Sequence, residues 1–495
     1  GGVFVWDAAK DKAEHNGGTI IAPEALTAWD GTHGQLASYL DWSGIGVGCF
    51  VRVNFESLLA TFFGLSSNLS PSNSKVCLNK FHSTSHGSYI LDADYQIIVD
   101  GSVKLEEKVN INYDSLSCSI LSNNPLEPAF KLSGRYCSIK KLPTLGFSQD
   151  VTLDYGTEND LGAVALQFTG LARSNIGEIR IKHAGIGFNL AQHAGFGWPT
   201  SNNMFSVTFG FIDINDVSFQ FFDLNPWQGG NTGSVINSLY MNNNVNGTVK
   251  KCVRFGDIGG CSEMLVSLMN TEHAETSNLL RFSSDCDSFN VNTFHVEGIR
   301  TLNQNNYLIY LNENTKLLID SFVMTYNYFT DDALEKNYIF RLGGTPSVRV
   351  VNFTERDAIK TGTPHFKMYY FGAVQLSPCK ISIYSFNSGS FDSLLSGDGV
   401  LSSYRQYPPL SVDGLYPDQI PLKLDDQSLV WNPQAKTSRV IVYKNQTTVR
   451  TFTTLENGRY EGATCKIYNT SPSHEVAVTA GSLTFNIPVN SSTSL

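Results

Sequence analysis

Four stretches in the middle of the chain decide the fold: CVRFGDIGGCSEMLVSLM at 252–269, LLRFSSDCDSFNVNTF at 279–294, LIYLNENTKLLIDSF at 308–322 and IFRLGGTPSVRVVNF at 339–353. Each stretch is a hydrophobic run, a polar or glycine-rich break and a second hydrophobic run. Aligning Phe255, Phe282, Leu311 and Leu342 as equivalent positions gives spacings of 27, 29 and 31 residues. Spacings in this range are typical of solenoids, in which each repeat buries its apolar face against its neighbours.

Within each copy the apolar residues alternate with polar ones at period two, and β-branched and aromatic residues are frequent, so the runs indicate short strands. A propeller blade needs four strands in roughly 40 to 45 residues, and the observed period is shorter. We therefore predict an all-β chain with a parallel β-helix over about residues 80–387. Fainter copies at 165–181 and 219–239 extend the pattern upstream.

Charge and cysteine content exclude several classes of partner. The net charge is −10 with no cluster of Lys or Arg, so we expect neither nucleic acid nor a membrane surface as partner. The nine cysteines are scattered and show no C-x-x-C spacing, so we expect buried thiols, no metal site, no disulfide framework and no cofactor. No apolar stretch reaches the roughly 20 residues of a membrane helix, which predicts a soluble chain.

The two ends differ from the middle. Residues 1–55 hold Trp6, Trp29 and Trp42 and predict a small β-rich head. Apolar residues at helical spacing in 55–65 predict a short amphipathic helix that caps the coils, within a cap and linker over 56–79. A Pro- and Tyr-rich segment predicts a linker over 388–427. Short alternating runs with turn residues between them predict a C-terminal antiparallel β-sandwich over 428–495, for trimerisation or carbohydrate binding.

These features together resemble a bacteriophage tailspike of the capsule-depolymerase kind. The most specific piece is FVWDAAKDKAEHNGGTII at 4–21, and HVEG at 295–298 ends one rung. The chain departs from the common tailspikes because the G-A-x-x-D-G-x-x-D-[ST] opening of the coil is replaced by residues 54–82. The resemblance implies a right-handed, pectin-lyase-like β-helix, a homotrimer, a place on the virion tail through a missing N-terminal region, and host adhesion through a bacterial capsular polysaccharide or exopolysaccharide.

Two glutamates fall in one column of the predicted coils. With Met269, Phe294 and Phe322 facing inward, the outward residues are Glu272 and Glu297, on successive strands about 4.8 Å apart. Like charges at that distance raise the pKa of one carboxyl, and a protonated acid beside a carboxylate suits glycoside hydrolysis. We predict Glu297 as acid/base and Glu272 as nucleophile or stabiliser, with the reverse assignment open. Ordinary solvated glutamates are the alternative, and Glu275 is a nearby competitor.

Other side chains suit saccharide binding. Trp198, Trp227 and Gln228 lie in loops that interrupt the repeat, where indole faces stack on sugar rings and amides bond hydroxyls; packing of the loops is the alternative. The predicted binding set is completed by His295, Asn270, Tyr240 and Asn242, although Asn270 also suits a turn or an amide ladder. Asp223 is a third predicted catalytic acid, and Asp213 and Asp216 are alternatives to it.

The leading function is an endo-acting glycoside hydrolase. A polysaccharide lyase on the same scaffold needs a base and favours a basic groove, which the acidic composition disfavours. A non-catalytic adhesin that only holds its glycan is the third class.

Overall fold

The structure is a computed structural model. It describes residues 2–29, 32–153, 155, 163–190, 204–224, 231–283, 285–301, 307–311, 314–330, 336–342, 346–356, 359–361, 365–371, 380–387, 393–397, 422–425, 429–431, 438–444, 448–454, 464–480 and 483–494.

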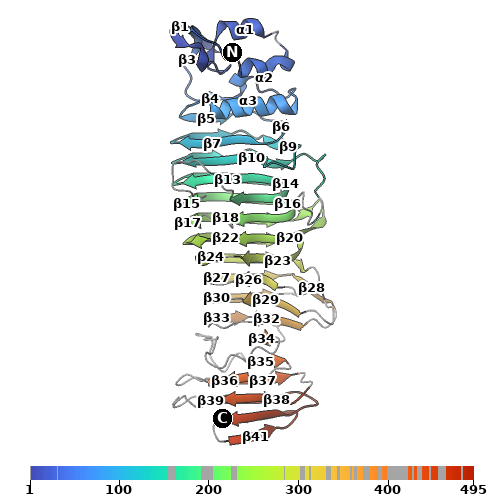
Figure 1. Ribbon diagram of the computed structural model, residues 1–495. Coiled ribbons are helices and arrows are strands. Elements are labelled where there is room, and N and C mark those ends of the chain that lie inside the picture. Colours follow the sequence, from blue (N-terminus) through green and yellow to red (C-terminus); the bar gives the residue numbers. More distant parts are fainter. Residues whose placement is uncertain are drawn as a thin grey trace. The chain divides into compact units, whose positions relative to one another are not determined.

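The chain divides into two compact units, Gly1–Leu268 and Met269–Leu495, called the N-terminal and C-terminal units below. Figure 1 labels helices and strands of both units. Strands dominate the described part of both units. None of the helices in the described ranges has the length and apolar character needed to cross a membrane.

The N-terminal unit begins with a head. Its antiparallel sheet pairs β1 (Val3–Asp11) and β2 (Ile20–Ile21) with the central β3 (Val47–Val53). Asn16 closes the turn before β2, because its Oδ1 accepts hydrogen bonds from the backbone N–H groups of Gly18, Thr19 and Ile20. The other head elements are η1 (Lys12–Glu14), α1 (Pro23–Ala28), η2 (His33–Gln35) and α2 (Leu36–Leu40).

The capping helix predicted over 55–65 is wrong. That segment forms β4 (Leu58–Leu59) and η3 (Ala60–Phe63), which ends at Gly64 with a left-handed φ of 82°. The helix is α3 (Pro71–Ser83) instead, and it starts where Ser70 Oγ accepts from Asn73 N–H and Pro71 occupies the first turn. Serine before proline is a strong helix start, whereas apolar spacing alone does not distinguish a helix from irregular core.

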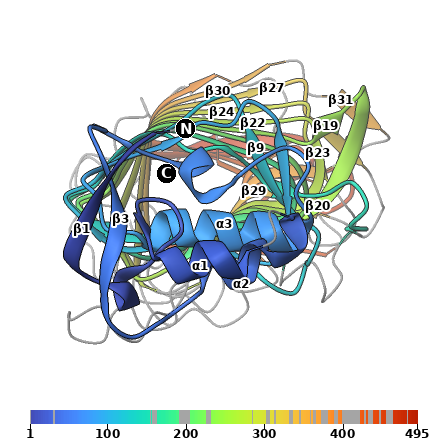
Figure 2. The same cartoon turned by 90° about the horizontal axis from the view of Figure 1, so that it is seen from above.

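Helix α3 covers the edge of the first strands. It packs against α2, β6 (Gln96–Val99) and β7 (Val103–Val109), and Figure 2 shows it beside α2. Its Asn79 accepts from Lys104 N–H at 2.8 Å and donates to the Ser102 carbonyl at 3.4 Å. These two bonds pair backbone groups that an open strand edge leaves exposed.

After the helix, the N-terminal unit is a stack of strands that pair in parallel, except that β19 (Asn244–Val245) pairs antiparallel with the start of β20 (Thr248–Ile258). Register runs from Ile179 on β14 through Ile212 on β16 to Leu239 on β18, all of them buried. Aromatic rings stack along the same direction, with the Phe221 and Phe255 centroids 4.5 Å apart. The strands are β5 (Ser88–Leu91), β8 (Asn112–Ser115), β9 (Ser119–Ser122), β10 (Phe130–Arg135), β11 (Ser138–Lys141), β12 (Thr144–Phe147), β13 (Val164–Ala172), β14 (Asn175–Leu190), β15 (Met204–Phe205), β16 (Thr208–Leu224), β17 (Asn231–Thr232), β18 (Val235–Asn242), β19 (Asn244–Val245), β20 (Thr248–Ile258) and β21 (Cys261–Ser262).

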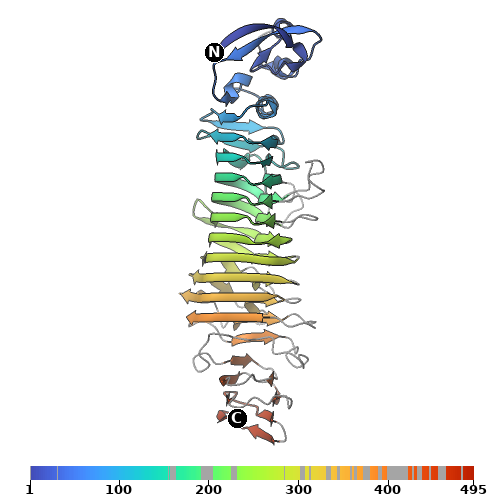
Figure 3. The same cartoon turned by 90° about the vertical axis from the view of Figure 1, so that its left-hand side faces the viewer.

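The C-terminal unit continues with parallel ladders of its own, drawn in yellow and orange in Figure 3. Phe282, Leu311 and Leu342 are in register, which confirms two of the predicted equivalences. Phe294 and Phe322 are also in register, buried, with ring centroids 5.0 Å apart. The strands are β22 (Met264–Glu272), which begins in the N-terminal unit, β23 (Ala274–Phe282), β24 (Cys286–Glu297), β25 (Arg300–Thr301), β26 (Tyr307–Leu311), β27 (Thr315–Thr325), β28 (Tyr328–Thr330), β29 (Lys336–Leu342), β30 (Ser347–Arg356), β31 (Ile359–Thr361), β32 (His365–Phe371), β33 (Lys380–Asn387) and β34 (Ser393–Gly397).

The predicted antiparallel sandwich is also wrong. From β35 to β40, successive strands alternate between two sheets, ordered β35-β37-β39-β42 and β36-β38-β40-β41, and these six strands pair in parallel within their sheets. Only the last pairs, β39 with β42 and β40 with β41, are antiparallel. Short alternating strands fix which side chains are buried but not which strand is the partner. The strands are β35 (Leu422–Asp425), β36 (Leu429–Trp431), β37 (Ser438–Lys444), β38 (Arg450–Thr454), β39 (Thr464–Asn469), β40 (Val476–Ala480), β41 (Leu483–Ile487) and β42 (Ser491–Ser494).

The segment predicted as a linker, 388–427, also contains strands. β34 pairs in parallel with β32, through Lys367 and Ser393 among others, and β35 pairs with β37. The described coil pairing therefore continues past residue 387.

Candidate functional site

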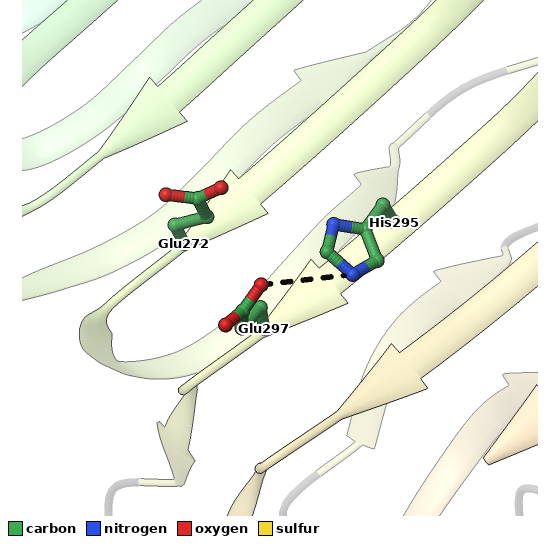
Figure 4. Close-up of side chains that lie close together, drawn as sticks. All are labelled: Glu272, His295 and Glu297. Carbon is green, nitrogen blue, oxygen red and sulfur yellow. Dashed lines mark ion pairs between the residues drawn. The ribbon is translucent and has the colours of Figure 1, made fainter. Parts of the chain in front are cut away.

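The ends of β22 and β24 bring the two predicted glutamates together in the C-terminal unit (Figure 4). On β24, Phe294 and Val296 are fully buried, so the intervening His295 and the following Glu297 project from the other face of the strand. Thr271 on β22 is likewise buried and leaves Asn270 and Glu272 on the outward face. The period-two pattern thus places four polar side chains on one wall.

The distances within this group are short. The ligand atoms of Glu272, His295 and Glu297 all lie within 4.8 Å of one another, and His295 Nε2 is 3.7 Å from Glu297 Oε2. The side chains are partly open to solvent, with relative exposures of 16% for Glu272, 28% for His295 and 32% for Glu297. A reactant in solution can therefore reach both carboxyl groups.

Asn270 fixes the orientation of the histidine ring. Its Nδ2 donates to Glu272 Oε1 at 2.7 Å, so its Oδ1 faces His295 Nδ1, also at 2.7 Å. An amide oxygen only accepts, so His295 carries hydrogen on Nδ1 and Nε2 is the acceptor when the ring is neutral. Thr325 Oγ1 lies 2.9 Å from Nε2 and donates to it. We call Glu272, His295, Glu297, Asn270 and Thr325 the glutamate cluster.

Two residues next to the glutamate cluster, His273 and Gly298, have left-handed backbone angles. His273 has a left-handed φ of 46°, and its N–H donates to the Glu297 carbonyl at 2.9 Å. Gly298 has a φ of 63°, and a Cβ there would lie 2.9 Å from His273 Cδ2. Only glycine fits both the backbone angle and this contact, which gives HVEG a structural reason for its last residue.

Thr325 and His273 were not predicted as site residues. The alignment of the repeats places Thr325 in the same column as Glu297, and the structure confirms that register. The repeat therefore indicated that Thr325 lies on the strand next to His295. His273 gave no signal, because a left-handed residue that is not glycine has no sequence pattern of its own.

Glu275, the predicted competitor, lies on β23 beside Arg300 of β25, with which it is in register. Arg300 Nη1 is 3.6 Å from Glu275 Oε1. A carboxylate with an arginine partner is better suited to a structural ion pair than to acid/base chemistry.

The remaining described candidates are in the N-terminal unit. Tyr240 and Asn242 are on β18, in register with Asp213 and Asn215. Asp223, at the end of β16, is in register with Asp257 on β20, and Asp257 forms a 2.6 Å ion pair with Arg254. Trp198, Trp227 and Gln228 lie outside the described residues.

Asp216 belongs to a second cluster, which we call the aspartate cluster. His183 Nδ1 lies 2.9 Å from Asp216 Oδ2, and Lys250 Nζ contacts Asp216 Oδ1. His183 Nε2 lies 2.9 Å from the Val151 carbonyl. The hydrogen bond to Asp216 raises the pKa of His183. Burial pushes the pKa of Asp216 upward, but the bonds from His183 and Lys250 together outweigh it and lower that pKa.

Both ring nitrogens of His183 therefore face groups that only accept hydrogen bonds. A carboxylate and a carbonyl are both satisfied only when the ring carries two N–H groups. The aspartate cluster is thus two cations around one anion, and Asp216 is fully engaged in it.

Comparisons with known proteins add little to this geometry. No protein-family model matches the chain, and no curated protein matches it. Among solved structures, the chain is similar to the enzymatically active domain of bacteriophage CBA120 tailspike protein 2, with 13% sequence identity and a TM-score of 0.37. The match covers 78% of this chain and 52% of that chain, so this chain spans about half the length of the protein it matches.

Proposed function

We propose that this chain hydrolyses glycosidic bonds within a bacterial capsular polysaccharide or exopolysaccharide, with Glu297 as acid/base and Glu272 as nucleophile or stabiliser. The observation that carries the proposal is the pair of partly exposed carboxyl groups on successive strands, with ligand atoms within 4.8 Å of one another. Retaining glycosidases place their two carboxyl groups about 5–5.5 Å apart, and inverting ones about 6.5–9.5 Å. The short separation favours retention.

Hydrogen bonding distinguishes the two roles. Asn270 Nδ2 donates to Glu272, and an amide donor suits a carboxylate that attacks the anomeric carbon. Glu297 is the more exposed of the two and faces His295 Nε2, which suits a group that exchanges protons with the sugar oxygen and with water.

The reaction then has two steps. Glu272 forms a bond to the anomeric carbon while Glu297 gives its proton to the departing glycosidic oxygen and the C–O bond breaks. Glu297 next removes a proton from water, and the resulting hydroxide displaces Glu272 from the anomeric carbon. His295 and Asn270 hold the cluster and contact sugar hydroxyls.

The wider assignment rests on the resemblance of residues 4–21 to tailspikes. On that ground we include in the proposal a homotrimer on the virion tail that adheres to the host through the same glycan. Trp198, Trp227, Gln228, Tyr240 and Asn242 are proposed as further saccharide contacts, and Asp223 as the alternative acid.

The test is digestion of a panel of purified bacterial capsular polysaccharides, with analysis of the products. New reducing ends without ultraviolet absorbance support hydrolysis, whereas unsaturated ends that absorb indicate a lyase. Glycan that is bound but stays intact indicates an adhesin.

Variants locate the site in the same assay. Glu297→Gln is expected to abolish cleavage without changing thermal melting, and Glu275→Gln, which alters a glutamate paired with Arg300, is the matched control with full activity. Cleavage that survives Glu297→Gln moves the proposal to Asp223.

A further inference from the structure

The glutamate cluster also has the donor set of a metal site, and we propose that Glu272, His295 and Glu297 bind a divalent transition-metal ion of the Zn²⁺ or Co²⁺ class. Their ligand atoms lie within 4.8 Å of one another. Two ligands on one tetrahedral Zn²⁺ are about 3.3 Å apart, from bond lengths of about 2.0–2.1 Å. His295 Nε2 and Glu297 Oε2 are already 3.7 Å apart, so rotation of the two glutamate side chains closes the site.

The imidazole decides which class of ion fits. Calcium and magnesium take oxygen ligands, whereas a neutral imidazole with carboxylates suits zinc, cobalt and their neighbours. Cysteine spacing, which predicted no metal site, is uninformative here because the three ligands come from two strands that the coil aligns.

The histidine is oriented as metal-binding histidines are. A ligating imidazole usually donates its other N–H to a carbonyl or carboxylate, which fixes the tautomer. His295 donates from Nδ1 to Asn270 Oδ1 at 2.7 Å and turns Nε2 towards Glu297. Thr325, whose hydroxyl contacts Nε2 at 2.9 Å, is the group that the ion displaces.

Occupancy of this site has a consequence for catalysis, and that consequence rests on the proposed function. An ion bound to both carboxylates leaves neither of them able to attack carbon or carry a proton. We therefore expect zinc to inhibit polymer cleavage reversibly, with activity restored by a chelator.

The test measures metal binding without any substrate. The full chain, without a histidine tag, is titrated with ZnCl₂ in a calorimeter, and Co²⁺ binding is followed by its visible absorption. We expect one saturable site per chain, an affinity at least about tenfold weaker in His295→Ala, and a loss of about 10–100-fold in Asn270→Ala, which removes both the acceptor that orients His295 and the amide donor to Glu272. His474→Ala, which removes a histidine hydrogen-bonded to Ser473 in the loop between β39 and β40, is the control with unchanged affinity.

Absence of saturable binding overturns the proposal, and so does binding that persists unchanged in His295→Ala. A melting temperature equal to that of the parent chain establishes that each variant is folded; if His295→Ala unfolds, Glu297→Gln replaces it with the same expectation. Zinc binding in a chain that cleaves no glycan leaves the metal site standing and removes the proposed function. Cleavage of glycan without zinc binding leaves the proposed function standing and removes the metal site.

Discussion

Two histidine–carboxylate clusters lie among the described residues, and they differ in the number of basic partners that each carboxyl group has. In the aspartate cluster of the N-terminal unit, Asp216 accepts from both His183 and Lys250, and the second nitrogen of His183 contacts the Val151 carbonyl. In the glutamate cluster of the C-terminal unit, Glu297 Oε2 lies 3.7 Å from His295 Nε2 and Glu272 Oε2 lies 3.8 Å from Nδ1 of the neighbouring His273. The first cluster has two basic partners for one carboxylate, whereas the second has one histidine for each carboxyl group.

The difference separates a structural site from a reactive one. A partly buried carboxylate with two basic partners stabilises the fold, because removing any member leaves the others unpaired. Two partly exposed carboxyl groups within 4.8 Å of one another form a site that suits a cation or an oxocarbenium-like transition state. We therefore expect mutations in the glutamate cluster to reduce activity and mutations in the aspartate cluster to reduce stability.

The largest expected effect is on activity at Glu272. Replacing it by Gly removes the proposed nucleophile, and we expect polymer cleavage to fall by at least about 100-fold, the lower end of the range for loss of a positioned catalytic group. Sodium azide, a small anion that fits the vacated space, should restore part of the rate and give a glycosyl azide of inverted configuration. Melting should be unchanged. Full activity without azide would remove Glu272 from the mechanism.

The second effect is on stability at Asp216. In Asp216→Asn, His183 and Lys250 lose their shared anion, and we expect unfolding to become easier by about 2 kcal/mol, less than for a fully buried pair because Lys250 is half-exposed. Polymer cleavage should stay at the parent level. Asp213→Asn is the control, since Asp213 accepts a part-buried hydrogen bond from the neutral amide of Asn215 and not from a cation. Equal denaturation midpoints for the two variants would contradict the structural role.

The sequence predicts the coil because every repeat contributes the same information. Phe282, Leu311 and Leu342 recur at a fixed place in their runs, and their register was correct. The same alignment put Glu272 and Glu297 on one face, since side chains alternate strictly along a strand. The proximity of these two residues was therefore predictable without knowledge of any contact.

Features that occur once were not predictable in the same way. The cap was misplaced because apolar spacing at 55–65 outweighed the Ser70–Pro71 start signal of α3. Strand pairing near the C-terminus depends on which of the two sheets each strand joins. The alternation of apolar and polar residues along a strand does not determine this. The aspartate cluster joins residues from three strands through left-handed positions at His183 and Asp216, a geometry with no sequence period.

A smaller effect is expected at Gly298, behind the glutamate cluster. Gly298→Ala puts a Cβ 2.9 Å from His273 Cδ2 at a φ of 63°, and we expect a loss of about 1–2 kcal/mol of stability from the left-handed backbone. Cleavage should fall only modestly, because the carboxylates themselves remain. Gly233→Ala is a matched control: its φ is 61°, and a Cβ there meets only Ser206 Oγ at 3.6 Å, an ordinary contact, so its cost reports the backbone. A larger loss at Gly298 than at Gly233 isolates the His273 contact, and equal losses would deny it.

The smallest effect is a pH dependence that belongs to the aspartate cluster. The pKa of His183 is raised above its ordinary value of 6.5 in the folded chain, so its contribution to stability is fully present below about pH 6.5 and is lost as pH rises through the folded value. The pKa of Asp216 is lowered from 3.8, so its contribution is present above that pH and is lost in stronger acid. Stability from this cluster is therefore greatest between these limits.

Thermal melting from pH 5.5 to 8.5 checks this sign. Across that range the melting temperature of the parent chain should fall by about 1–2 °C more than that of His183→Gln. In a unit of this size such a shift corresponds to a fraction of a kcal/mol of unfolding free energy. His183→Gln keeps a side chain that donates to Asp216 but has nothing to titrate, so its curve should be flatter. Parallel curves for the two proteins would mean that His183 does not carry the second proton that its two acceptors require.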